Sequence, residues 1–516
     1  MSKRMDFLGQ LFHRGTNITD IFSFNRPKAI KWQEKTLKKL LYKARNTEFG
    51  KTYQFDNILI SHHAANEFRE KVPIHKYETM HLWWKREYSG ENNITWPGRP
   101  RYFALSSGTT EGSSKYIPVT DDQLKSILRA SRRQLFAVFR TDVPKDFFTK
   151  NYLMIGGSTD LNFNGVSYSG DLSGITTSNV PLWFERFAKP GEEIQRQRDW
   201  HKKLELMVAS APDWDVVMVA GAPAWIKILL ETVIDRYGLE NIHQIWPNFS
   251  VYTWGAVSIA PYKKQLDAMM GTPIKYFETY LASEGFVAFE TKPEASGMRL
   301  VLRNNTYFEF VPFNENNFDE NGELLPNAKA LTLAEIDEET EYAILLTTCA
   351  GAWRYLIGDT IKFTDAESCE IKITGRIKHY LSLCGEHLTV ENMNEGVQRT
   401  AEEFGVEIPE FTVKGYKDNG NMGHHWFVAC DNKDLDAEKF REKLDANLNL
   451  LNDDYAVERK HVLRNMKLEV LPESVFLGWL EKHGKLGGQS KFPRVMSDKN
   501  YEDWCQYLVS LKVGAV

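Results

Sequence analysis

Hydrophobic positions in the first part of the chain alternate between helical stripes and short apolar runs. A helix is expected over residues 31–45, where apolar side chains recur every three or four positions. From about 101 to 280, apolar runs such as 216–219 alternate with amphipathic stretches such as 121–139 and 223–237. This alternation predicts βαβ units around a largely parallel, buried sheet.

The pattern changes twice farther along the chain. Residues 298–376 contain consecutive short runs of β-forming residues, which predict a β-rich, barrel-like subdomain. After about residue 385 the expected order is helix, strand, strand, helix, strand, as a small split-βαβ domain requires. We therefore predict an α/β protein with a large N-terminal α/β domain over 1–380, which includes the β-rich subdomain, and a small α+β domain over 381–516.

Composition narrows the classes of function. The chain has 516 residues and a net charge of −5 at pH 7, which argues against affinity based on neutralising nucleic-acid phosphates. Its five cysteines are scattered without a C-x-x-C pair, so a reducing compartment is favoured over a disulfide framework or a zinc knuckle. No apolar run reaches the ~18 residues that a membrane span needs. We expect a cytoplasmic protein that binds neither nucleic acid nor a membrane.

The most informative segment runs from Leu105 to Pro118, between an expected strand and an expected helix. It combines glycines, which let the backbone approach a ligand, with hydroxyls that can bind phosphate oxygens. Ser113 and Ser114 stand where a Walker loop needs glycine and lysine, so an ordinary P-loop is excluded. The composition of this segment fits a phosphate-binding loop and a solvated turn between a strand and a helix equally well.

Three further residues could carry chemistry, each with a plainer alternative. Glu284 follows the apolar strand 274–277, where open α/β sheets bind ligands, and could hold Mg²⁺ or be merely solvated. Asp359 lies in an expected turn between two strands, where a carboxylate could accept ribose hydroxyls. Lys491 follows a Gly-Gly pair and could neutralise a reacting phosphate or be a solubilising charge.

In order and spacing, these segments closely resemble the plant auxin-responsive (Gretchen Hagen) family of acyl-acid amido synthetases, a branch of the firefly-luciferase-like adenylating superfamily. The likeness covers nearly the whole chain. Beyond the segments above, it includes Trp246 to Asn248, Thr253 to Ala256, Tyr307 to Phe310, Thr347 to Gly351 and Gln489 to Arg494.

The resemblance implies an adenylate-forming architecture with a mobile C-terminal domain, ATP and Mg²⁺ as cofactors, and an aryl or alkyl carboxylic acid and an amino acid as substrates. Lys491 and Glu284 would be catalytic, with Glu284 binding Mg²⁺ and Lys491 reaching the α-phosphate. Asp359 would take the ribose. The other implied nucleotide-binding residues are Ser106, Ser107, Gly108, Thr109, Thr110, Thr253, Trp254, Gly255, Ala256, Tyr280 and Ser283.

Two other functions stay open: transfer of the acyl group to a thiol such as coenzyme A, and an inactive scaffold that has kept the fold. The acid, the amino acid and the oligomeric state also stay open. No G-x-S-x-G elbow supports serine hydrolysis. The pairs His62-His63 and His424-His425 lack companion metal ligands, so we interpret them as structural. An acyl pocket is expected along 121–139 and 222–230.

Overall fold

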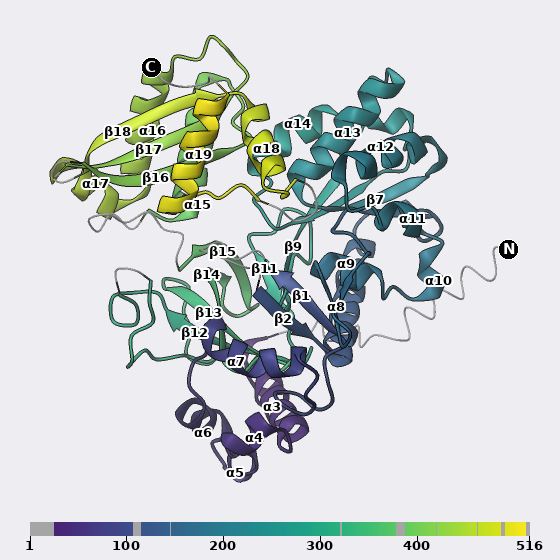
Figure 1. The fold of residues 1–516 in the computed structure, drawn as a ribbon, viewed down its shortest axis with the longest axis vertical. Helices are drawn as coiled ribbons and strands as arrows, with labels where there is room; N and C mark the ends of the chain where they lie inside the picture. The colour runs from purple at the N-terminus through teal and green to yellow at the C-terminus, as the bar shows by residue number, and fades with distance from the viewer. Residues whose placement is uncertain are drawn as a thin grey trace.

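An eleven-stranded sheet forms the centre of the large N-terminal part of the molecule (Figure 1). The computed structural model describes residues 25–106, 115–144, 146–319, 322–377, 388–418, 421–461, 463–486 and 491–511. The strand order in this sheet is β12-β13-β14-β15-β11-β10-β9-β8-β7-β3-β6.

One half of this sheet is parallel, as the alternating pattern predicts. It comprises β3 (Asn151–Met154), β6 (Ala188–Lys189), β7 (Val216–Gly221), β8 (Val251–Gly255) and β9 (Lys275–Ala282). The other half is antiparallel and contains the predicted β-rich segment. It comprises β10 (Gly285–Phe289), β11 (Met298–Leu300), β12 (Thr306–Pro312), β13 (Glu341–Thr348), β14 (Tyr355–Asp365) and β15 (Glu370–Arg376). The β-rich segment therefore continues the parallel sheet through β11 and β10.

Helices cover this sheet, and two of them have the predicted bounds. These are α8 (Asp121–Phe139), where the Thr120 side chain accepts a hydrogen bond from Gln123 N, and α13 (Pro223–Tyr237). N-capping and a first-turn proline explain why both starts are readable from sequence. The remaining helices of this region are α9 (Leu172–Thr177), α10 (Leu182–Glu185), α11 (Glu192–Gln195), α12 (Trp200–Ser210) and α14 (Ala260–Ala268).

A second sheet and a group of short helices complete the N-terminal part. The sheet has the order β2-β1-β5-β4, with β1 (Tyr102–Ser106), β2 (Lys115–Val119), β4 (Asn162–Phe163) and β5 (Tyr168–Gly170). The helices are α3 (Arg26–Ala44), α4 (Glu48–Thr52), α5 (Phe55–Ile60), α6 (Ala64–Lys71) and α7 (Tyr77–Tyr88). Helix α3 begins earlier than the apolar pattern predicts because the Asn25 side chain caps it, accepting from Lys28 N.

The C-terminal part contains the predicted helix, strand, strand, helix and strand in that order, together with helices that the pattern does not predict. The expected split-βαβ arrangement is wrong, because the last two strands are direct parallel neighbours with no strand between them. Its three-stranded sheet has the order β16-β17-β18. The elements are α15 (Val390–Phe404), β16 (Phe411–Asp418), β17 (Asn421–Ala429), α16 (Ala437–Leu451), α17 (Asp453–His461), β18 (Leu463–Leu471), α18 (Glu473–Lys482) and α19 (Asp498–Ser510). The predicted boundary at 380/381 lies outside the described residues. Over the ranges given above, no helix combines the length and hydropathy of a membrane span.

One sequence-based expectation is wrong: Asp359 lies inside strand β14, not in a turn. The turn lies before it, because Leu346 on β13 already pairs with Tyr355. The register then shifts along β14, and Gly358 sits in this irregular stretch with φ 96°. A bulge of this kind bends a strand without ending it, and glycine tolerates the positive φ.

A buried ion pair joins β14 to the N-terminal helices. Arg354 and Glu309 are 4% and 1% exposed, and Arg354 Nη2 lies 3.0 Å from Glu309 Oε1. Arg354 Nη1 also donates to the carbonyls of Arg69 (2.9 Å) and Val72 (2.7 Å), at the end of α6. One guanidinium therefore holds strand β12, the start of β14 and α6 together.

Replacing Glu309 by Gln should lower the free energy of unfolding by roughly 3–5 kcal/mol, because it leaves the Arg354 charge buried and unpaired. Urea unfolding followed by circular dichroism measures the change. The matched control is Glu395→Gln, which breaks the exposed pair with Arg399 (2.7 Å) and should cost less than about 1 kcal/mol. Equal effects of the two substitutions would contradict the role given to the buried pair.

Candidate active site

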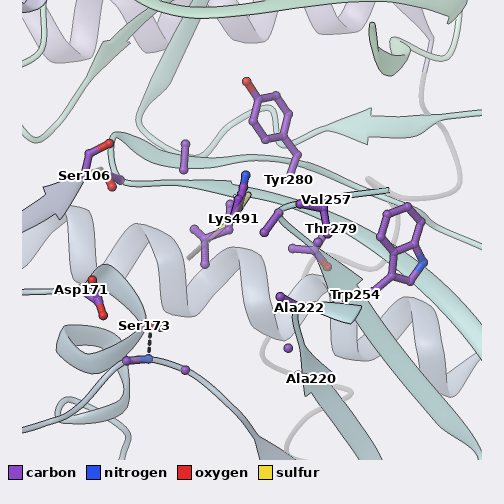
Figure 2. Close-up of a pocket in the computed structure, with 18 of the residues that line it drawn as sticks. Ser106, Asp171, Ser173, Ala220, Ala222, Trp254, Val257, Thr279, Tyr280 and Lys491 are labelled. Atoms are coloured by element: carbon purple, nitrogen blue, oxygen red, sulfur yellow. Dashed lines mark hydrogen bonds between the residues drawn. The ribbon is translucent and has the colours of Figure 1, made fainter. Parts of the chain in front are cut away.

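A large cleft lies at the carboxyl ends of the parallel strands, where open α/β sheets bind ligands. Its volume is about 1620 Å³. The ends of β3, β7, β8 and β9 contribute residues to it, as do α8, β14, β15 and the segment that begins at Lys491. Figure 2 shows a selection of these residues, with Ser106, Trp254, Tyr280 and Lys491 among them. Segments far apart in the sequence thus meet around one space.

Asp359 is held in the cleft by two hydrogen bonds. Tyr280 Oη donates to Asp359 Oδ2 (2.5 Å), and Arg376 Nε donates to Asp359 Oδ1 (2.6 Å). Burial acts to raise the pKa of Asp359, but the Arg376 charge and the two hydrogen bonds outweigh it and hold the pKa below its usual range. Burial also keeps Tyr280 protonated, since it raises the pKa of the phenol well above its usual value. Asp359 is therefore an ionised, fixed acceptor.

Glu284 occupies the two-residue turn between β9 and β10, later than the sequence-predicted end of its strand. The side chain is 6% exposed and lines the cleft. Burial, together with the Asp359 charge, raises the pKa of Glu284 to about 7, although a backbone hydrogen bond acts in the opposite direction. Gln123 Nε2 on α8 donates to the Glu284 carbonyl (2.7 Å) and fixes the turn.

The end of β8 is a strained segment with an unused polar atom. Ala256 has φ 75°, a conformation that costs about 1–3 kcal/mol and clusters at functional sites. Gly255 approaches β9 so closely that a Cβ would stand 2.4 Å from Thr279 O. The buried Thr253 Oγ1 has no hydrogen-bond partner among the described residues. This atom is available to a ligand, and Trp254 lines the cleft beside it.

Lys491 extends into the cleft from the C-terminal part (Figure 2). Water reaches the side chain through the cleft, yet protein surrounds it. Loss of hydration and the Arg376 charge together lower the pKa of Lys491 to about 8, against the opposite effect of Asp359. An ammonium group with a lowered pKa, close to Asp359 and Arg376, is well placed to interact with a bound anion.

Two more predicted residues, Ser106 and Ser283, also line the cleft. Ser107, Gly108, Thr109 and Thr110 lie outside the described residues. Of the expected acyl-pocket helices, α8 lines the cleft, whereas Trp225 of α13 is 2% exposed and packs against Trp200 at 4.9 Å in the core. The structure thus brings all the described candidates together.

Sequence reasoning assigned no ligand-contacting role to three charged residues of the cleft. Arg376 donates the hydrogen bond that holds Asp359 in place. The only feature of the sequence that marks Arg376 is its position after a threonine and a glycine at the end of an expected strand. Asp171 and Lys203 lie in another part of the cleft, where Lys203 Nζ donates to Gly156 O (2.8 Å). Burial lowers the pKa of Lys203 to about 8. Nothing in the local sequence distinguishes these two from solvated charges.

Comparison with known proteins shows the family of the chain. Three family models match the chain: the GH3 family N-terminal domain over residues 21–224, the central domain over 299–376 and the C-terminal domain over 391–500. The chain belongs to the GH3 family. The expected membership is confirmed, and the matches cover most of the chain.

Similar proteins carry names of one activity class. The chain is 24% identical to the jasmonoyl-L-amino acid synthetase JAR6 of Nicotiana attenuata over 92% of both chains. It is 22% identical to the indole-3-acetic acid-amido synthetase GH3.2 of Arabidopsis thaliana, over 77% of this chain and 83% of that relative. The expected activity class, a ligase of the amido synthetase type, agrees with these GH3 relatives.

Solved structures confirm the predicted α/β, adenylate-forming architecture. The GH3.15 acyl acid amido synthetase superposes with a TM-score of 0.77 at 15% identity, covering 94% of this chain and 93% of that one. A 2-hydroxyisobutyryl-CoA ligase in the postadenylation state superposes with a TM-score of 0.59 at 14% identity, covering 93% and 92% of the two chains. This GH3 chain therefore shares its fold with both kinds of ligase.

Glu284→Gln should change how stability depends on pH. A carboxyl whose folded pKa is raised to about 7 from 4.5 contributes stability below pH 4.5 that is lost as pH rises through 7. The glutamine of the variant does not titrate, so the variant does not lose this stability. Its free energy of unfolding relative to that of wild type should therefore rise by up to roughly 3 kcal/mol from pH 5 to pH 8. Urea unfolding at both pH values measures the difference. The exposed Glu339→Gln should show no such gain, and a pH-independent difference for Glu284→Gln would contradict the buried carboxyl.

Proposed function

We propose that this GH3 protein is an ATP-dependent acyl-acid amido synthetase that activates a carboxylic acid as its acyl-adenylate and conjugates it to an amino acid. One observation carries the proposal: Lys491 lies in the same cleft as Glu284 and the Tyr280–Asp359–Arg376 network. A cation, a buried carboxyl and a fixed acceptor are the groups that adenylation of an acid requires. The names of the GH3 relatives support the same reaction.

The nucleotide would bind along the ends of β8, β9 and β14. The adenine would lie between Tyr280 and the segment from Thr253 to Ala256, with the Thr253 hydroxyl free to bond it. Asp359 would accept the ribose hydroxyls, because each of its oxygens keeps a lone pair beyond its bond to Tyr280 or Arg376. The phosphate contacts are assigned to Ser106, Ser107, Gly108, Thr109, Thr110 and Ser283.

The residues present fit a magnesium ion at Glu284. The carboxyl is buried, lines the cleft and has no ion-pair partner within the ranges that the structure describes. A cation beside this buried carboxyl would offset the burial that raises its pKa, and Mg²⁺ is commonly held by one or two carboxylates and substrate phosphates. Bound there, the ion would neutralise phosphate charge.

The first half-reaction would form one P–O bond and break another. A carboxylate oxygen of the acid attacks the α-phosphorus of ATP, and pyrophosphate leaves with the bridging oxygen. Lys491 would lie between the two anions, offset their repulsion and stabilise charge that builds on the phosphorus. In the second half-reaction the amine of the amino acid attacks the acyl carbon, AMP leaves, and the amine gives up a proton.

Apolar side chains that line the cleft suit the hydrocarbon part of the acid. They are those of Leu128, Leu135, Met154, Met218, Ala222 and Val257. Such residues bury aryl or alkyl groups and recognise little else, so shape decides which acid enters.

The experiment that tests the function is ATP-dependent pyrophosphate release with benzoate, indole-3-acetate, jasmonate and straight-chain fatty acids, each with and without mixed amino acids. A product whose mass equals acid plus amino acid minus water is expected. A thioester formed only when coenzyme A is added would overturn the amide assignment, and no release with any acid would contradict adenylation.

Lys491→Ala should lower acid-dependent pyrophosphate release by about 10²- to 10³-fold while ATP binding changes little, because its proposed contact strengthens in the transition state. Steady-state release and equilibrium titration with a nucleotide analogue measure the two effects. Lys499→Ala, an exposed lysine on α19, is the matched control. If ATP binding and pyrophosphate release fell by the same factor, the role proposed for Lys491 in the transition state would be wrong.

A further inference from the structure

The C-terminal part touches two helices of the N-terminal part away from the nucleotide end of the cleft. Figure 1 shows α18 beside α13 and α14. Gln265 on α14 donates to Glu407, and Lys227 on α13 pairs with Glu473 at the start of α18 (3.0 Å). These contacts join residues that are 142 and 246 positions apart. They join the N-terminal part to the C-terminal part, which carries Lys491.

The most buried of these contacts is a chain of three side chains. Tyr262 on α14 is fully buried, and its hydroxyl donates to Glu410 Oε1 (2.5 Å). Arg494 Nη1 donates to the other oxygen, Glu410 Oε2 (2.5 Å), and also to Phe411 O (3.0 Å). Burial and the Glu410 charge raise the pKa of Tyr262 well above its usual value, so the phenol stays a donor.

This chain is coupled directly to Lys491 through the backbone. Arg494 O accepts from Val413 N (2.9 Å), and Met496 N donates to Val413 O (2.9 Å). Residues 494–496 are thus fixed along the edge of β16, next to Glu410. Lys491 lies three residues before Arg494. If Arg494 moves away from α14, we therefore expect Lys491 to move out of the cleft with it.

The charged residues are distributed between the two parts so that this contact can break without leaving a buried charge unpaired. Glu410 and Arg494 both belong to the C-terminal part, so their ion pair moves intact, and what this contact loses when it opens is the Tyr262 hydrogen bond. At the second contact, Lys227 keeps Glu231 on its own helix (3.7 Å) when Glu473 leaves. Separating a buried pair is costly, whereas losing one hydrogen bond to a charged group is a modest change.

We propose that Tyr262 and Glu410 are positioning residues that form a releasable latch, which holds the C-terminal part where Lys491 reaches the cleft. The proposal rests on the function proposed above. The latch favours the first half-reaction, in which Lys491 acts, and has no role once the acyl-adenylate exists. The position of Lys491 in the cleft then depends on the hydroxyl of Tyr262, which belongs to the N-terminal part.

The test compares Tyr262→Phe, which removes only that hydroxyl, with wild type. Acid- and ATP-dependent pyrophosphate release, measured with the most active acid of the panel, should fall about tenfold or more, the effect of one hydrogen bond to a charged group. Amide formation from the chemically prepared adenylate of that acid should stay within about twofold of wild type, since it bypasses Lys491. Small-angle X-ray scattering of the ligand-free protein should show a larger radius of gyration.

Two further variants serve as controls. Lys263→Ala alters the neighbouring residue, which pairs with Asp267 on its own helix (2.9 Å), and should leave all three measurements unchanged. Glu410→Gln weakens the same latch from the other side and should reproduce the split between half-reactions. Because it also removes the charge that pairs with Arg494, urea unfolding of both variants, at the temperature of the assays, is needed to show that each is folded.

Equal losses in both half-reactions, or unchanged release in Tyr262→Phe, would overturn the latch. If wild type released no pyrophosphate with any acid, the proposed function would fail instead. The scattering comparison would then decide the latch alone, and identical profiles for wild type and Tyr262→Phe would refute it.

Discussion

The neutralisation of one buried carboxylate organises the cleft. Asp359 can stay ionised out of water only because Arg376 and Tyr280 each bond one of its oxygens. That requirement links β14 to its hairpin neighbour β15 and, through Tyr280, to β9, which β11 and β10 separate from them in the sheet. The same charge then acts on its surroundings, since it favours protonation of Glu284 and ionisation of Lys491. The electrostatics of the site are therefore a property of the network.

Elements with local signals were predictable from sequence. Helices α8 and α13 have their predicted bounds because a capping threonine and a first-turn proline mark their starts. The C-terminal order of elements followed from periodicity in the same way. The position of Asp359 was not predictable, because a glycine in a short polar segment predicts a turn as well as a bulge. The cross-strand partner that decides between them, on β13, is remote in sequence.

The residues of the candidate site also fall into those that the sequence identifies and those that it does not. Tyr280, Glu284, Asp359 and Lys491 could be named because their segments resemble a known family, and the structure brings them to one cleft. Arg376, Lys203 and Tyr262 could not be assigned, because their importance arises from burial and from partners across the fold. A lone arginine or tyrosine carries no sign of such a partner in its own neighbourhood. Fold membership is thus easier to infer than the interactions that tune a site.

The wide spacing of the cleft residues has a consequence for synthesis. Ser106, Thr253, Glu284, Asp359 and Lys491 come from five separate stretches of the chain, and the segment of Lys491 pairs with β16 and packs against α18 and α19 of the C-terminal part. During translation the large sheet can form while the last hundred residues are still inside or near the ribosome. A nascent chain at that stage would present the sheet side of the cleft without Lys491. Any reaction that needs Lys491, as the proposed adenylation does, could start only after the segment that carries this residue has been made.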